Sequence, residues 1–193
     1  MKKAKKVLLL ALCAILLVGA TIAGTVAYLT SQQTVTNTFT VGKVSITLTE
    51  KEIDPQTGKQ LANAADVTAL QNIELVPSRE IEKAPKITVS SDSEECYLFV
   101  KIDNALTSAG VINGMDNWVS ISGNANSDSV SIYRYNATVN AGAEINVFTS
   151  FTCNTSLVYD ASLEGKQINI TAYAIQAEGL TAEQAAAALG LTN

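Results

Sequence analysis

The chain has 193 residues, of which 13 are basic, 18 are acidic and none is histidine. Without an imidazole, the sequence excludes zinc proteases of the HExxH type and nucleophilic sites of the Ser-His-Asp and Cys-His types. The net charge is −5, with no basic patch beyond the first six residues, so nucleic acids and anionic membrane surfaces are poor candidates as partners.

The first 27 residues have the three parts of a secretory signal peptide. Four lysines within residues 2–6 precede the apolar run 7–23, and Thr25 and Ala27 place small side chains at the third-last and last positions before Tyr28. We therefore expect cleavage after Ala27 by signal peptidase and export through the general secretory route. The expected location is extracellular or at the cell surface, with membrane contact only before cleavage. The alternative is an uncleaved transmembrane anchor, since residues 7–23 are just long enough for a short span.

Cleavage would leave residues 28–193, a length typical of one domain with a sizeable core. Because four of the 13 basic residues belong to the signal, the mature chain would carry nine basic and 18 acidic residues, a net charge of −9. Its two cysteines, Cys96 and Cys153, lie in strand-like runs. They predict either a disulfide, which export permits, or two buried thiols that act as small apolar fillers.

Residues 28–37 form a polar segment, YLTSQQTVTN, with neither glycine nor proline. Tyr28, Leu29, Thr30 and Val35 favour an extended strand, and no strand partner lies nearby in the sequence. We interpret the segment as a leader that could act as a donor strand. A disordered N-terminus is the alternative.

From residue 38 onward the pattern is that of one all-β domain. Apolar and polar residues alternate in short runs separated by turn signals, as is typical of half-buried antiparallel strands. We predict an antiparallel two-sheet β-sandwich for residues 38–193, closed by a short helix over residues 181–189 that begins with a capping box. Residues 60–75 are ambiguous and could form a short helix. The expected strands lie within residues 39–48, 87–89, 96–102, 118–121, 129–135, 145–151 and 167–176.

Candidate sites for chemistry are few, and each has a simpler interpretation. The three acidic residues within 92–95 could bind calcium, but their spacing matches no EF-hand loop, and we expect solvated acids. Trp118, Tyr133 and Tyr135 could form a sugar-binding surface, although aromatic residues in alternating strands more often pack in the core. The sequence therefore assigns no catalytic residue, no metal site and no cofactor.

One group of motifs resembles a known family. Gly24, Thr25, Ala27 and Tyr28, followed by NTFTVG at residues 37–42, are similar to the opening of the TasA/camelysin-like family of exported Gram-positive proteins. Signal peptides of this family are cut by the specialised signal peptidase SipW. Further similar segments are ECYLFVK at residues 95–101, VFTS at 147–150 and AYAIQAEG at 172–179.

The resemblance implies a jelly-roll-like fold and a structural role in a fibre of the biofilm matrix or in a cell-surface layer. In fibre-forming members, the mature N-terminal segment of one subunit adds as a strand to the next. For this chain, that implies Tyr28, Leu29, Thr30 and Val35 as donor-strand residues, and the chain itself or a related fibre protein as the partner.

Two other functions remain open. One is a monomeric secreted or surface-attached module that binds a glycan or a partner protein. The other follows from the metalloprotease label that camelysin-like members carry, but with no histidine and no recognisable metal motif we do not transfer that activity. We expect a structural protein and not an enzyme.

Overall fold

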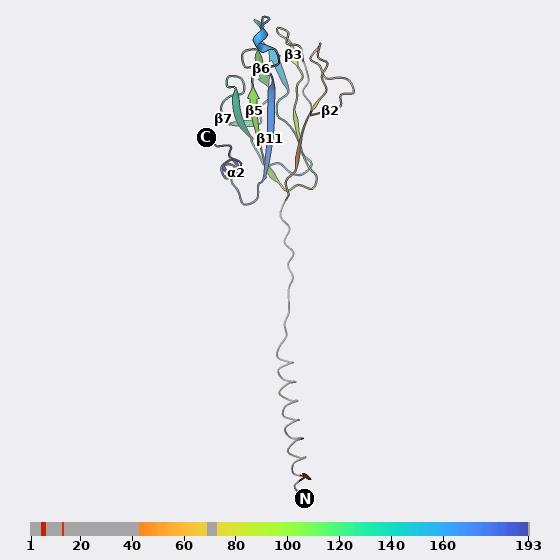
Figure 1. Cartoon of the computed structure of the whole chain (residues 1–193), viewed down its shortest axis with the longest axis vertical. Coiled ribbons are helices and arrows are strands. Elements are labelled where there is room, and N and C mark those ends of the chain that lie inside the picture. Colours follow the sequence, from red (N-terminus) through yellow and green to blue (C-terminus); the bar gives the residue numbers. More distant parts are fainter. Residues whose placement is uncertain (1–4, 7–12, 14–42, 69–72, 193) are drawn as a thin grey trace. The chain divides into compact units, whose positions relative to one another are not determined.

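The computed structural model of the chain describes residues 5, 6, 13, 43–68 and 73–192 (Figure 1). The chain divides into two units, residues 1–40 and 41–193, and every strand named below lies in the second unit, which we call the body. The predicted cleavage site and the predicted donor-strand residues lie outside the described residues. They are Thr25, Ala27, Tyr28, Leu29, Thr30 and Val35.

The body consists almost entirely of antiparallel strands, which confirms the all-β prediction. The described residues form three sheets, with strand orders β2-β1-β4-β9, β3-β10-β6 and β11-β5-β8-β7, where two sheets were expected. The strands are β1 (Ile46–Lys51), β2 (Asp66–Val67), β3 (Glu80–Ile81), β4 (Lys86–Val89), β5 (Cys96–Asn104), β6 (Gly110–Asn113), β7 (Trp118–Ser122), β8 (Val130–Tyr135), β9 (Glu144–Asn146), β10 (Ser150–Cys153) and β11 (Ile168–Gln176). The helices are the 3-10 helix η1 (Ala161–Leu163) and α2 (Ala182–Ala188).

Two of the three sheets share one register. Ile81 pairs with Phe151 in the β3–β10 ladder, and Lys86 pairs with Asn146 in the β4–β9 ladder. Residue number rises by five from Ile81 to Lys86 and falls by five from Phe151 to Asn146, so the two antiparallel ladders keep the same register across the gap between them. Pro85 lies in this gap, where it has no N–H to donate, and its carbonyl accepts a hydrogen bond from the Val147 N–H at 2.8 Å.

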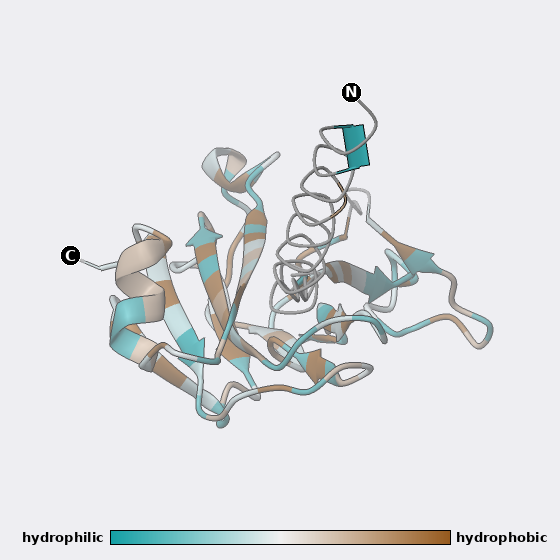
Figure 2. Ribbon diagram, turned by 90° about the horizontal axis from the view of Figure 1, so that it is seen from below, coloured by the Kyte–Doolittle hydropathy of each residue, from teal (hydrophilic) through white to brown (hydrophobic). Residues whose placement is uncertain are grey.

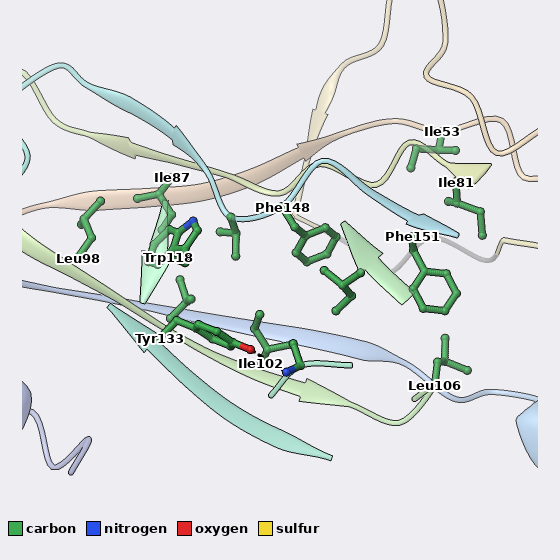
Figure 3. Packing of buried hydrophobic residues seen from close by; sticks show 14 of the residues in the cluster. Ile53, Ile81, Ile87, Leu98, Ile102, Leu106, Trp118, Tyr133, Phe148 and Phe151 are labelled. Carbon is green, nitrogen blue, oxygen red and sulfur yellow. Dashed lines mark hydrogen bonds between the residues drawn. The ribbon is translucent and has the colours of Figure 1, made fainter. Parts of the chain in front are cut away.

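The main core cluster draws side chains from all three sheets, and Figure 3 shows part of its packing. Strand β5 illustrates how alternation divides the side chains. Leu98, Val100 and Ile102 are fully buried in the main cluster, whereas Phe99 is buried on the opposite face. Apolar and polar residues alternate in the same way along other strands of the body (Figure 2).

Helix α2 covers the outer face of the β11-β5-β8-β7 sheet, where Ala185 and Ala186 pack with Phe99. The predicted capping box is present: the Gln184 N–H donates to the Thr181 hydroxyl at 3.3 Å, and the Thr181 N–H donates to the Gln184 side chain at 2.9 Å. A helix of seven residues is too short to be stable alone, so this packing is what maintains it.

The segment 60–75 forms no helix in the part that the structure describes. Instead β2 pairs with β1, with Val67 opposite Glu50 and Asp66 opposite Lys51. The Glu52 N–H adds a hydrogen bond to the Ala65 carbonyl at 3.0 Å. Backbone hydrogen bonds to β1 take the place of the hydrogen bonds that a helix in this segment would have formed within itself.

Candidate functional site: an open strand edge beside an apolar groove

The edges of the sheets differ in how far they are protected. An edge strand presents unpaired N–H and C=O groups, which makes it a template for another strand unless it is short, interrupted or covered. Three of the edge strands, β2, β3 and β9, have only two or three residues. A fourth, β7, is interrupted by a register shift between Ser120 and Ser122.

The edge of β9 is also covered by a side chain. The Trp118 indole N–H donates to the backbone carbonyl of Asn146 at 3.0 Å. The Val89 N–H bonds to the Ala143 carbonyl, and this sets the phase of the β4–β9 ladder so that Asn146 directs its backbone away from β4. The indole therefore occupies the position that an additional strand would use.

The edge of β6 is covered by an asparagine. The Asn126 carboxamide accepts from the Ile112 N–H at 2.7 Å and donates to the Ile112 carbonyl at 3.1 Å. These are the same two hydrogen bonds that a residue of a neighbouring strand would exchange with Ile112. Nothing in the local sequence distinguished Asn126 from the other loop asparagines, and sequence reasoning missed it.

The nine-residue strand β11 has an open edge. It pairs with β5 on one side, and no described residue pairs with its other side. The Ala105 N–H donates to the Gln167 carbonyl at 3.1 Å and the Ala177 N–H to the Glu95 carbonyl at 2.9 Å. These bonds set the phase of the ladder, so the even-numbered residues of β11 direct their backbone groups to the open side. The side chains of those residues that pack against the core are Ile168, Ile170, Ala172 and Ala174.

Strand β1, which is in contact with β11, is also open over part of its length. The Ser90 N–H donates to the Ser45 carbonyl at 2.9 Å, so Ile46 and Leu48 direct their backbone groups away from β4. The β2 strand covers β1 only from Glu50 onward. The described residues thus leave two facing strand edges uncovered.

A groove of about 940 Å³ opens at these edges, and its lining mixes apolar side chains with charged ones such as Glu74, Asp160 and Lys166. Strand β1 supplies one wall, the beginning of β11 supplies another, and the loop 157–167 lies at its rim. The apolar side chains that line it are Leu48, Val67, Ile73, Leu75, Ile81, Leu106, Phe151, Leu157, Val158, Leu163, Ile168 and Ile170.

One ion pair lies in the wall of this groove. Lys83 Nζ contacts both carboxylate oxygens of Glu50, at 2.7 and 2.6 Å. The two side chains are only 16% and 14% exposed. Because the charges satisfy each other, this part of the wall presents no unpaired charge to an occupant.

The two cysteines do not meet. Both Cys96 and Cys153 are free, buried thiols. Cys96 begins β5, whereas Cys153 pairs with Gly110, which follows the other end of that nine-residue strand. The ends of such a strand are about 26 Å apart at about 3.3 Å per residue, and a disulfide needs Cα atoms within about 7 Å. The structure therefore has no disulfide here, and the buried-thiol interpretation describes both residues.

The aromatic residues considered for sugar binding do not form an exposed surface. Trp118 and Tyr133 belong to the buried core cluster, as Figure 3 shows. The Tyr133 hydroxyl accepts a hydrogen bond from the Ala125 N–H at 2.7 Å, and Tyr135 packs edge-on against Trp118 with ring centroids 5.3 Å apart. Burial of two of the three rings removes the stacking faces that a sugar would need.

The acidic residues within 92–95 are engaged separately. Asp92 forms an ion pair of 2.6 Å with Lys43, and the hydrogen bond from that ammonium group lowers the pKa of Asp92. The Glu95 carboxylate accepts a hydrogen bond from the Thr138 hydroxyl. In the described part of the chain, no group of three or more metal-ligating side chains comes together. No helix in that part is long and apolar enough to cross a membrane.

Comparisons of the chain with protein-family models, with curated proteins and with solved structures return no match.

Proposed function

We propose that this protein is a non-catalytic subunit of an extracellular fibre or cell-surface layer, of the biofilm-matrix type. Each subunit would place its leader, residues 28–36, along the open edge of β11 in the next copy. The observation that carries the proposal is the difference between the edges: among the described residues, β11 is open over nine residues beside the groove, β1 is open only before Glu50, and the other edges are short, interrupted or covered. An exposed edge of this kind accepts an extended segment by strand addition.

The leader suits the groove in length and in charge. It has nine residues, as β11 does. No charged residue lies between Lys6 and Lys43, so a strand from this region would carry no unpaired charge into an apolar site. In an extended conformation Leu29 and Val35 share one face and could point into the groove.

The point where the leader joins the body and the groove that would receive another leader lie at opposite ends of the body. The Glu94 N–H bonds to the Lys43 carbonyl, and the Ala177 N–H bonds to the Glu95 carbonyl, so the chain enters the body beside the end of β11. The groove is lined by Ile168 and Ile170, at the beginning of β11. Donation from one end to the other is head-to-tail and does not close, so it would produce filaments.

The fold that accompanies this proposal is a two-layer, jelly-roll-like sandwich. Supporting it is the shared register of the β3–β10 and β4–β9 ladders, which unites two of the three sheets into one interrupted layer. The β11-β5-β8-β7 sheet would be the second layer. The open edges of β1 and β11 would then belong to different layers, and the donated strand would pair with β11.

The test is negative-stain microscopy of two untagged proteins, one beginning at Tyr28 and one at Asn37. We expect fibres from the first and monodisperse particles from the second. Fibres from both would contradict donation by the leader. Monodisperse particles from both would contradict self-assembly and favour a secreted module that binds an extended segment of another protein. Mass spectrometry of the exported protein should give Tyr28 as the first residue.

A further inference from the structure

The loop at the rim of the groove, residues 157–167, carries an unusual apolar pair. Val158 is 76% exposed and Tyr159 is 83% exposed, whereas the next most exposed large apolar residue that the structure describes, Val119, is 47% exposed. Both side chains line the groove. Two adjacent apolar side chains left in water at the opening of a groove indicate a surface that a partner covers.

Core packing and hydrogen bonds fix the rest of this rim loop. Leu157 and Leu163 pack against the main core cluster, on either side of the exposed pair. The Asp160 carboxylate caps η1 by accepting from the Ser162 N–H at 2.8 Å, and the Tyr159 hydroxyl donates to Glu164 Oε1 at 2.8 Å. Val158 and Tyr159 are therefore exposed in a loop whose conformation is fixed by its own contacts.

We propose that Val158 and Tyr159 form a clamp that packs over an extended, uncharged segment lying along β11, and that this segment is the leader of a second copy. The inference rests on the proposed function and adds the residues that hold the inserted strand from outside. Backbone pairing with β11 would fix the direction and register of the strand. The clamp would exclude water from its outer side, and the apolar contact would slow its release.

Charge argues against an anionic lipid surface as the occupant. The loop carries Asp160, Glu164 and Lys166, a mixed set with a net negative charge that an anionic membrane would not attract. Glu164 is already engaged by Tyr159 and Asp160 by the cap of η1. The most exposed apolar part of the rim is the Val158–Tyr159 pair, and the uncharged stretch of this chain before Lys43 suits it.

The test uses fluorescence anisotropy to measure binding of a labelled peptide with the sequence of residues 28–41 to a shortened protein, which is the body with residues 37–40 before it. This shorter chain retains every residue of both described core clusters. We expect the double variant Val158→Ser/Tyr159→Ser to bind the peptide at least about tenfold more weakly, mainly through faster dissociation. The matched control is Val119→Ser, an exposed valine on β7, which should bind within about twofold of the original protein.

Two further variants separate the clamp from other causes. Tyr159→Phe removes only the hydroxyl bond to Glu164, so it should retain binding if the ring itself makes the contact. A peptide with Leu29→Asp should bind weakly to every form of the body. Unchanged peptide binding by the double variant, with an unchanged unfolding temperature, would overturn the clamp while the proposed function stands. Absence of peptide binding to the original body would overturn both.

Discussion

The indole of Trp118 donates its N–H to the backbone carbonyl of Asn146 at 3.0 Å, and this single bond covers an edge of the β2-β1-β4-β9 sheet. The ring is held in place by edge-on packing against Tyr135. The only tryptophan of the chain thus has a double role, as a core side chain and as a cover for a strand edge.

Replacing Trp118 by Phe should retain most of the apolar contact and leave the Asn146 carbonyl without its donor. Loss of the bond together with the smaller ring should lower the free energy of unfolding by about 1–3 kcal/mol. Urea denaturation of the body measures this change. An equal loss for Val119→Ala, an exposed neighbour in β7, would show that the effect does not depend on the indole.

Replacing Asn126 by Ala should uncover the β6 edge. The Ile112 N–H and carbonyl would lose their partners, and the 40% exposed Val111 beside them would make the edge attractive to another strand. The variant is made in the shorter protein that begins at Asn37, which has no leader to donate. We expect this Asn126→Ala protein to form dimers or larger species, as measured by light scattering. Adding Val111→Lys should restore the monomer, because a charge on an edge strand opposes pairing. A variant with Ala at 126 that stays monomeric at high concentration would contradict the covering role.

Replacing Lys83 by Met should leave Glu50 as an unpaired charge in the wall of the groove. The pair is largely shielded from water, so the free energy of unfolding should fall by about 1–3 kcal/mol near neutral pH. Binding of the leader peptide should weaken as well, because the occupant would lie beside an uncompensated carboxylate. Lys83→Met combined with Glu50→Leu should recover much of the stability. Additive losses in the double variant would contradict the coupling of these two residues.

The buried thiols predict a decline in stability at alkaline pH. Burial raises the pKa of both Cys96 and Cys153 above the ordinary value of 9.0. Because the unfolded chain releases these protons first, the stabilisation is complete below about pH 9 and is lost as the pH rises toward the folded-state pKa values. Denaturation curves between pH 8 and 10 should therefore be less steeply pH-dependent in Cys96→Ala/Cys153→Ala. Native body should also react slowly with a thiol reagent at pH 8 and rapidly in urea; fast reaction of both thiols in the folded protein would contradict their burial.

Much of the fold could be predicted because it depends on local patterns. In β5 the period of two that predicts the strand also divides its side chains, and Leu98 and Val100 are turned to the main core. The helix near the C-terminus followed from the capping residues Thr181 and Gln184. Short elements were harder: β2 has two residues, and its pairing with β1 could not be seen in the ambiguous segment around it.

The sequence by itself determined the export signal pattern, the all-β class, the faces of the longer strands and the absence of histidine chemistry, since each of these depends on residue type or on a period of two along the chain. The tertiary structure decided which strand edges are covered within the described residues. The order and register of distant strands bring Asn126 into hydrogen bonding with the backbone of β6 and Trp118 with the backbone of β9. The same order places Cys96 far from Cys153. Strand order arises from long-range pairing, and no local period records it. The groove beside β11 is a consequence of that order.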